Sequence, residues 1–188
     1  EIAKVHGIEN FEKMEAGQYP LTRDAGFLDL PWTIIDNNGG ASLGVTVGAG
    51  NGGYGLAMNA PAQAADEWIV TPAAELVAAA SYRFGFDFRN WGGSPVTIQL
   101  AWGNTPDPTQ MTVFATYANI MPGGFVTAKT LGGGFDPYFN TPFYTGDYYI
   151  AMRFTTSGTN AYFSVDNLKL DDNPSPPNRS ILRMRTAS

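Results

Sequence analysis

The stretch "NAYFSVDNLKL", Asn160–Leu170, begins with the alternation of a β-strand and then breaks it. Its apolar residues stand at odd positions up to Val165 and at even positions from Leu168 onward. A half-buried strand alternates with a period of two, so the phase slips by one residue at Asp166 and Asn167. A β-bulge inserts one extra residue, returns the later side chains to their face and re-aims a side chain. The stretch therefore predicts a bulged strand that points Asp166 at a partner; the alternative is a strand-end turn with both polar side chains in water.

Four other stretches are predicted to be strands with one apolar face each, and the alternation is less regular in Met111–Tyr117 than in the other three. The four stretches are Ser81–Asn90, Val96–Trp102, Met111–Tyr117 and Tyr148–Thr155. Turn segments rich in Gly, Pro and Asn separate them, which is typical of an antiparallel sandwich. The Ala-rich stretch Pro72–Tyr82 fits a helix by propensity, but in this β-rich setting we interpret it as a turn leading into a strand. Among the tryptophans, the pattern places Trp32, Trp68 and Trp102 in structural or core positions.

The overall composition limits the classes of protein and of site. The 188 residues suit one domain that buries about 70% of its unfolded surface. The absence of Cys excludes disulfides and thiol chemistry, and no apolar run is long enough to span a membrane. Residues 1–173 hold 8 basic and 17 acidic residues, a net charge of −9, which argues against a nucleic-acid partner and suits a hard cation. The chain starts at Glu1 without Met or a leader pattern, which indicates a processed protein or an excised piece.

The C-terminal segment differs from the body. Residues 174–188 carry three Arg and no acid, and their many prolines favour an extended path. We therefore divide the chain into a β-sandwich body, 1–172, and a tail, 173–188, with a proline-rich linker and a short basic strand. We expect residues 180–188 to dock on another copy or a neighbouring domain; the alternative is that they fold back on their own body. The predicted assembly residues are Ile181, Leu182, Arg183, Met184 and Arg185.

Four segments together resemble the cleaved-adhesin or choice-of-anchor J family of surface β-sandwich domains, which includes the adhesin modules of gingipain proteases. The segments are "NFEKME", "PWTIID", "DEWIVTPAAEL" and "YYIAMRFTTSGTNAYFSVDNLKL", and the likeness covers about residues 10–171. It implies an all-β, antiparallel jelly-roll β-sandwich of galactose-binding-like type, a secreted or cell-surface bacterial protein, and often bound calcium. Two departures stand out: Asn167 replaces a second acid of the family pattern, and the tail has no counterpart.

A calcium site also follows from the expected strand order. The first and last strands of a jelly roll commonly lie side by side, which would bring Glu12 close to Asp166. Two carboxylates repel each other unless a cation lies between them, and Ca²⁺ takes six to eight oxygen ligands. Asp36, Asn37 and Asn38 follow "PWTII" on a turn and offer further oxygens. We therefore predict Ca²⁺ as the bound ion, with Glu12, Asp36, Asn38 and Asp166 as ligands; the alternative leaves Glu12 as an exposed strand-end acid.

Aromatic side chains in loops are the candidate ligand platforms. Trp91 lies in the loop "RNWGG", and Tyr138 and Tyr144 lie in the long loop "FDPYFNTPFYTGD". An exposed ring of this kind can stack on a sugar ring, so we predict Trp91, Tyr138 and Tyr144 as ligand-binding residues. The alternative for Trp91 is a ring folded back over the edge of the sheet.

Catalytic constellations are scarce. His6 is the single histidine, which excludes histidine-rich zinc sites, and no G-x-S-x-G elbow exists. The pair Asp66-Glu67 resembles a glycosidase pair in composition, but we interpret it as a solvated turn. The sequence therefore predicts no enzyme and no catalytic residue. We expect a calcium-stabilised extracellular adhesin or binding module for a glycan or a surface protein; the alternative is a structural subunit of a surface filament or other assembly joined through the tail.

Overall fold

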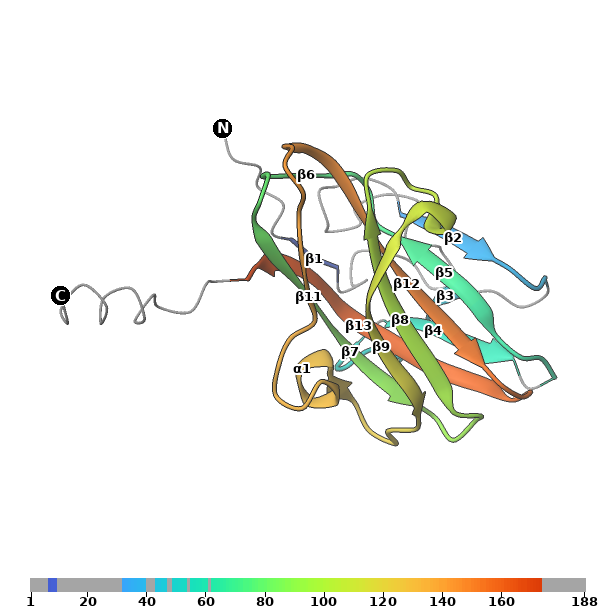
Figure 1. Ribbon diagram of the computed structural model, residues 1–188. Helices are drawn as coiled ribbons and strands as arrows, with labels where there is room; N and C mark the ends of the chain where they lie inside the picture. Colours follow the sequence, from blue (N-terminus) through green and yellow to red (C-terminus); the bar gives the residue numbers. More distant parts are fainter. Residues whose placement is uncertain are drawn as a thin grey trace.

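The computed structural model describes residues 7–9, 32–39, 43–46, 49–53, 55–60 and 62–173. These residues form two antiparallel sheets packed face to face (Figure 1). The elements in chain order are β1 (Gly7–Glu9), β2 (Thr33–Asp36), β3 (Gly44–Thr46), β4 (Gly55–Ala60), β5 (Asp66–Val70), β6 (Ala74–Leu76), β7 (Ser81–Asn90), β8 (Val96–Gly103), η1 (Pro108–Gln110), β9 (Thr112–Ile120), β10 (Val126–Thr127), α1 (Ala128–Leu131), β11 (Tyr138–Asn140), β12 (Gly146–Thr156) and β13 (Ala161–Asp172). The predicted all-β antiparallel sandwich is confirmed.

The first sheet has the strand order β10-β7-β13-β4-β3, with β1 beside β13 and β11 beside β7. In the register of β1 and β13, Gly7 lies opposite Leu170 and Glu9 opposite Leu168. The first described strand therefore lies against the last one, as expected for a jelly roll. Glu12, which the sequence places just after this strand, is outside the described residues.

The second sheet has the order β2-β5-β12-β8-β9, with β6 also paired to β12. Its central strand β12 alternates as predicted, with Tyr148, Ile150, Met152 and Phe154 buried and Arg153 between them on the outer face. Because successive side chains of a strand point to opposite faces, β12 supplies both the core and the outer surface of this sheet.

Aromatic side chains join the two sheets across the core. Phe88 on β7 and Phe163 on β13 lie 6.0 Å apart between ring centroids, and Phe154 on β12 lies 5.2 Å from Phe163 and 6.4 Å from Phe88. All three side chains are fully buried. Such a cluster contributes large apolar burial plus about 0.5–1.5 kcal/mol for each aromatic pair. Trp32 is also buried, as predicted, and Trp102 faces inward but stays partly exposed while stacking on Phe139 at 5.6 Å.

The predicted bulge in β13 is confirmed. Asp166 pairs with Asp87 of β7, the next pair is Lys169 with Gly85, and the register shifts between them. Asn167 occupies the shift with a φ of 51°, a left-handed conformation that Asn tolerates better than most residues. The strand continues to Asp172, and Asp166 is only 2% exposed. The alternative of a strand-end turn in water is therefore wrong.

The interpretation of Pro72–Tyr82 is confirmed, whereas the prediction for the tail is not tested. Pro72–Tyr82 contains no helix: it forms the short strand β6 and a turn that leads into β7, in line with our interpretation. The tail residues 174–188, including the predicted assembly residues Ile181 to Arg185, lie outside the described part of the chain. Within the part that is described, no helix has the length and apolar character needed to cross a bilayer.

Candidate functional site

The outer face of the six-stranded sheet carries a row of side chains that runs across four strands. The register places Ile35 of β2 opposite Trp68 of β5, Trp68 opposite Arg153 of β12, and Arg153 opposite Gln99 of β8. Trp68 points outward because its neighbours Glu67 and Ile69 fill inward positions and are fully buried. The prediction that Trp68 belongs to the core is therefore wrong: the strand around it is apolar, but its own position faces solvent.

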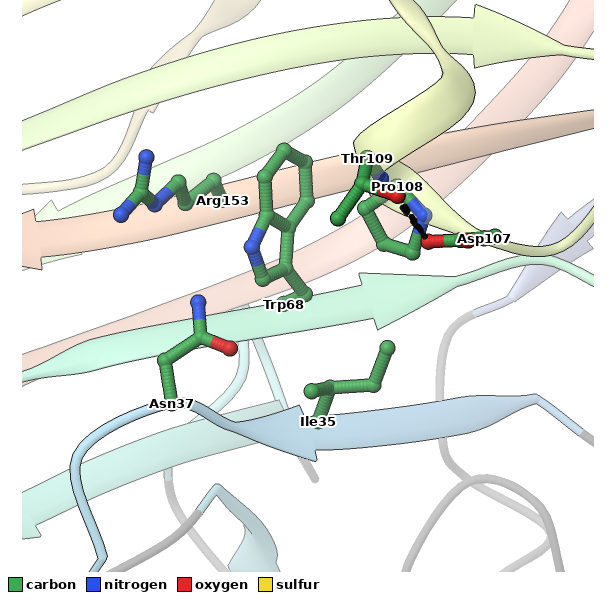
Figure 2. Close-up of a pocket in the computed structure, with 7 residues that line it drawn as sticks. All are labelled: Ile35, Asn37, Trp68, Asp107, Pro108, Thr109 and Arg153. Carbon is green, nitrogen blue, oxygen red and sulfur yellow. Dashed lines mark hydrogen bonds between the residues drawn. The ribbon is translucent and has the colours of Figure 1, made fainter.

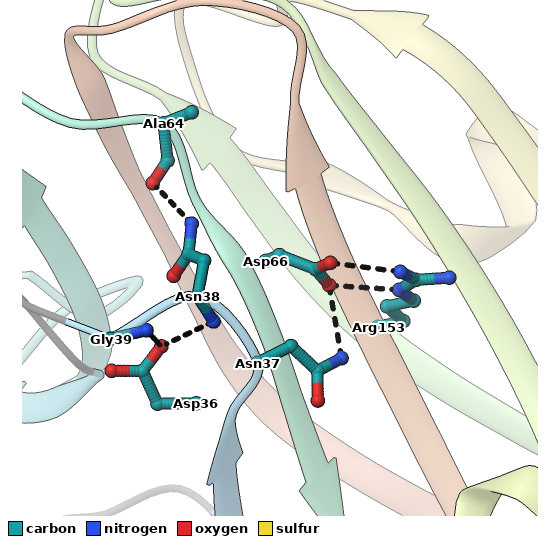
Figure 3. A network of polar contacts seen from close by, with 7 residues as sticks. All are labelled: Asp36, Asn37, Asn38, Gly39, Ala64, Asp66 and Arg153. Carbon is teal, nitrogen blue, oxygen red and sulfur yellow. Dashed lines mark hydrogen bonds and ion pairs between the residues drawn. The ribbon is translucent and has the colours of Figure 1, made fainter.

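Arg153 is held by Asp66, its neighbour on β5 (Figure 3). Nε and Nη2 of Arg153 each donate a hydrogen bond of 2.9 Å, to Oδ1 and Oδ2 of Asp66 respectively. Asn37 adds a third donor, with Nδ2 3.3 Å from Oδ1 of Asp66. The bonds from Arg153, with help from Asn37, lower the pKa of Asp66, and the same pair raises the pKa of Arg153. The arrangement fixes the guanidinium on the sheet surface in its charged form.

The guanidinium also contacts the indole. Cζ of Arg153 lies 5.5 Å from the ring centroid of Trp68, within the range of a cation–π interaction. Together, Asp66 on one side and Trp68 on the other limit the rotamers of Arg153. The indole of Trp68 projects from the sheet surface between Arg153 and the turn at Pro108 (Figure 2).

A short 3₁₀ turn closes the opposite side of this surface. Asp107 precedes η1 and accepts two bonds at Oδ1, from the backbone N–H of Thr109 at 2.9 Å and from its hydroxyl at 2.7 Å. These bonds lower the pKa of Asp107, so its carboxylate stays ionised. Pro108 opens the turn at a position where a missing N–H costs nothing. The result is a rigid rim that presents a carboxylate.

Between the sheet and the rim lies a pocket of about 390 Å³, which we call the Trp68 pocket (Figure 2). Its lining residues are Ile35, Asn37, Trp68, Asp107, Pro108, Thr109 and Arg153. The volume falls within the range of small-molecule sites, and an apolar wall with a few fixed polar groups is the usual composition of such sites. The pocket can therefore take a small ligand with one flat apolar face and several hydrogen-bonding groups.

The three aromatic residues predicted from the sequence lie elsewhere. Trp91 is 38% exposed but is folded back on the seven-stranded sheet, where its Nε1 donates to the hydroxyl of Ser164 at 3.3 Å and Arg89 lies 4.9 Å from its ring. Tyr138 is exposed on β11, and Tyr144 stacks on Tyr148 at 5.0 Å between centroids. None of the three lines the Trp68 pocket.

The predicted metal ligands lie on two different sheets. Asp36 ends β2 in the six-stranded sheet, and its Oδ1 accepts the backbone N–H groups of Asn38 and Gly39 at 3.2 and 3.0 Å (Figure 3). Asn38 donates through Nδ2 to the carbonyl of Ala64 at 2.9 Å. Asp36 and Asn38 therefore have local structural roles in the turn after β2.

Asp166 lies in the seven-stranded sheet next to a second acid. Its Oδ2 accepts the backbone N–H of Asn51 at 2.8 Å, and its Oδ1 that of Asn167 at 2.7 Å. Side-chain amides of the same two asparagines donate to Oδ2 of Asp87 at 3.2 and 2.8 Å. Among the described residues no three acidic or histidine side chains gather around one point. A calcium site at Asp166 therefore needs amide or backbone oxygens or residues from the undescribed part, and it stays a prediction.

The pair Asp66-Glu67 is not a solvated turn, and that interpretation is wrong. Both residues belong to β5, and adjacent strand residues point to opposite faces. Asp66 binds Arg153 on the outer face, whereas Glu67 is fully buried on the inner face. The two carboxylates are therefore separated by the sheet.

The sequence signal that could have identified Trp68 is the phase of β5. Glu67, Ile69 and Trp68 cannot share a face of the sheet, and assigning Ile69 to the core leaves Trp68 outside. No pattern in the sequence indicates that Arg153 and Asp107 line the same pocket as Trp68, because they come from distant points in the chain.

Comparisons with known proteins identify the fold. No family model matches this sequence, and no curated protein matches it either. Among solved structures, the K1 cleaved adhesin domain of Lys-gingipain from Porphyromonas gingivalis W83 aligns with a TM-score of 0.60 at 16% identity, over 89% of this chain and 98% of that domain. The resemblance to gingipain cleaved adhesin domains is thereby confirmed as a likeness of fold.

Two other solved structures have similar scores. TmCBM61, solved in complex with β-1,4-galactotriose, aligns with a TM-score of 0.56 at 14% identity, over 88% of this chain and 95% of that one. The Stig cyclase FisC from Fischerella sp. TAU, solved in complex with (3Z)-3-(1-methyl-2-pyrrolidinylidene)-3H-indole, aligns with a TM-score of 0.58 at 16% identity, over 90% and 98%. The same fold thus occurs in adhesin, carbohydrate-binding and cyclase proteins, so function has to be argued from the site.

Proposed function

We propose that this chain is a non-catalytic, extracellular binding module that recognises a glycan in the Trp68 pocket. The observation that carries the proposal is the outward-facing Trp68 beside a fixed Arg153–Asp66 pair. The likeness of fold to an adhesin domain and to a domain solved with a galactotriose supports this class of function.

The chemistry of the pocket suits a sugar. A pyranose ring has a face of C–H groups, which packs on the face of an indole, and a rim of hydroxyls that need donors and acceptors. Nη1 of Arg153 is not used in the bonds to Asp66, and Oδ2 of Asp107 is not used in the bonds to Thr109. These two groups would offer a donor and an acceptor on either side of Trp68.

The charges of the pocket favour a neutral ligand. Arg153 and Asp66 neutralise each other through their two bonds, which leaves the ionised Asp107 at the rim. An acidic sugar would approach this uncompensated carboxylate and be repelled, because like charges at close range cost free energy. We therefore place neutral, hydroxyl-rich saccharides ahead of uronic acids or sulfated sugars as ligands.

The non-catalytic assignment rests on the positions of the acids. Asp66 is bound to Arg153, and Glu67 is buried behind the sheet, so this pair cannot flank one glycosidic bond. We further propose that the module is stabilised by Ca²⁺ near Asp166 and works at a cell surface or in the extracellular medium, in keeping with its resemblance to adhesin domains.

Calorimetric titration with a panel of neutral and acidic oligosaccharides tests the function. We expect binding of a neutral oligosaccharide that Trp68→Ala weakens about 30-fold or more, the size of a hot-spot loss. Trp91→Ala is the matched control, because it removes an equally large ring outside the pocket, and it should leave affinity unchanged. Loss of binding in Trp91→Ala but not in Trp68→Ala would show that the glycan binds outside the Trp68 pocket. Turnover of any saccharide would contradict the non-catalytic assignment.

A further inference from the structure

A second hollow lies at the open side of the sandwich, between β9 and the segment around β11. We call it the aromatic groove; its volume is about 370 Å³, and its main lining residues are Phe114, Tyr117, Phe135, Asp136, Tyr138 and Phe139. Phe135 is 78% exposed and Tyr138 is 54% exposed, so two large rings that line one groove present apolar surface to solvent. Clustered exposed aromatic surface of this kind marks an interaction site.

The groove also has polar groups suited to a peptide backbone. Burial, with a contribution from Asp136, raises the pKa of Tyr117 to about 12, so its hydroxyl stays protonated and can donate to a carbonyl. The carboxylate of Asp136 lies 3.7 Å from Nη1 of Arg83, a long ion pair that leaves it able to receive another cation. Grooves lined by aromatic rings are typical receptors for proline-rich segments in the polyproline II conformation.

The described chain ends next to this groove. The N–H of Asn173 donates to the carbonyl of Ser81 at 3.0 Å, and Ser81 lies opposite Asn140 on the far side of β7. A hollow bounded by residues 79–81, Asn140, Thr141, Asp172 and Asn173 starts at this point. Asn140 also lines the aromatic groove. The two hollows therefore meet at Asn140 and form a path from the end of β13 to Tyr138.

The distance along this path is short. Two strand spacings of about 4.8 Å separate Asn173 from Asn140, and Tyr138 lies two residues further, about 7 Å along β11, which gives roughly 12 Å in all. Residues 174–179 read Pro-Ser-Pro-Pro-Asn-Arg. Six residues in polyproline II span roughly 19 Å, so this segment is long enough to reach the groove of its own chain.

The segment also has the right chemistry. Pro174, Pro176 and Pro177 lack the N–H groups needed to continue the β13 ladder, and their fixed φ favours polyproline II before any contact forms. Arg179 follows them and carries the charge opposite to that of Asp136. We propose that residues 174–179 of this chain occupy its own aromatic groove, with the prolines against Phe135 and Tyr138 and Arg179 near Asp136.

Attachment through β13 compensates for the weakness of such a contact. Short flexible connections give an effective concentration in the millimolar range, so a segment that binds weakly as a free peptide is largely bound when tethered at Asn173. The proposal is independent of the Trp68 pocket, which lies on the outer face of the six-stranded sheet and shares no lining residue with the groove between β9 and β11.

A paramagnetic label tests the proposal on the full chain. The chain has no Cys, so Ser180→Cys, directly after the proposed segment and away from the anchor at Asn173, provides a single attachment point for a nitroxide. We expect the amide signals of Phe135, Tyr138 and Asn140 to lose intensity, while those of Trp68 and Arg153 do not. Replacing Pro176 and Pro177 together with Gly should restore the groove signals. Uniform intensities over groove and pocket, or a pattern that the glycine variant leaves unchanged, would overturn the proposal.

Two matched pairs of variants locate the contact. Phe135→Ala should restore the lost intensity at Tyr138, whereas Phe143→Ala, which removes a 94% exposed ring outside the groove, should not. Asp136→Asn should restore part of it, whereas Asp147→Asn, an equal charge change on β12, should not. Equal effects within either pair would contradict the proposed placement.

A mixing experiment identifies the occupant. Spin-labelled chains without ¹⁵N are mixed with ¹⁵N chains that lack the label, so any intensity loss then reports a second copy. No loss in the mixture together with loss in the doubly labelled chain supports the contact within one chain. Loss of intensity in the mixture would assign the groove to a second copy and overturn the proposal. Groove signals that shift with an added oligosaccharide but are unaffected by the label would assign it to a glycan, with the same consequence.

Discussion

Arg153 donates two hydrogen bonds of 2.9 Å to the carboxylate of Asp66, although the two residues are 87 positions apart in the sequence. This pair ties β12 to β5 on the outer face of the six-stranded sheet and holds the guanidinium 5.5 Å from the ring centroid of Trp68. Arg is suited to this position because its planar fork matches both oxygens of one carboxylate. The shape of the Trp68 pocket therefore depends on the pair.

Arg153→Lys keeps the charge but replaces the two-pronged contact with a single ammonium. We expect the free energy of unfolding to fall by about 0.2–1 kcal/mol, the range of exposed pairs. Glycan affinity should fall as well, because the guanidinium fixed beside Trp68 is lost. Chemical denaturation and calorimetric titration measure the two effects. Arg83→Lys is the control, since Arg83 meets Asp171 through a single contact of 3.3 Å, and it should leave glycan affinity unchanged.

The lowered pKa of Asp66 predicts a pH dependence. A carboxyl group whose pKa is lower in the folded than in the unfolded state stabilises the fold above the unfolded value, and this contribution is lost as the pH falls through the folded value. The stability difference between wild type and Asp66→Asn should therefore be constant between about pH 5 and 7 and shrink below about pH 4. Urea unfolding across this range measures it; an equal difference at pH 3 and pH 7 would contradict the assignment.

The calcium prediction is tested by melting in EDTA and in excess Ca²⁺. A ligand that binds the folded state alone stabilises it by about 2.7 kcal/mol at 100 times its Kd, so Ca²⁺ should raise the Tm of the wild type. Asp166→Asn should remove most of this increase, because it takes a carboxylate charge from the predicted ligand set. Glu12→Gln should act in the same direction, while Asp136→Asn, outside that set, should not. Identical melting of the wild type in both solutions would disprove the calcium site.

The aromatic cluster between the sheets predicts a large packing loss. Phe163 is fully buried and lies 5.2 Å from Phe154 between ring centroids. Phe163→Ala should lower the free energy of unfolding by about 3–5 kcal/mol, because it leaves a cavity between two rigid sheets. Phe143→Ala removes the same ring from a solvent-exposed position and should change stability by at most about 0.5 kcal/mol. Denaturant unfolding of both variants provides the comparison.

The bulge predicts an unusual ranking of substitutions at Asn167. Its φ of 51° is strained for a residue with a Cβ, whereas Gly accepts it freely. Both Asn167→Ala and Asn167→Gly lose the 2.8 Å bond to Asp87, but the Ala variant should be less stable than the Gly variant by about 1–2 kcal/mol. Thermal melting of the two variants tests this, and an Ala variant as stable as the Gly variant would argue against the left-handed conformation.

The sequence by itself determined the architecture and the bulge. Strands such as β7 and β12 are visible because side chains alternate strictly between core and solvent, and that pattern is local. The phase slip at Asp166 and Asn167 is local too, since a one-residue insertion is the way for the chain to return Leu168 and Leu170 to the core. These features need no knowledge of which strands become neighbours.

The tertiary structure alone decided the site. Trp68, Arg153 and Asp107 come from two strands and a 3₁₀ turn, and nothing near any of them in the sequence indicates the other two. The position of Trp91 was also decided by tertiary contacts. Its place in a loop suggested a ligand platform, but its ring contacts Arg89 and Ser164 and packs on the sheet. Alternation is set by backbone geometry within one strand, whereas a pocket is set by strand order and register between segments far apart in the chain, and these depend on the packing of the whole core.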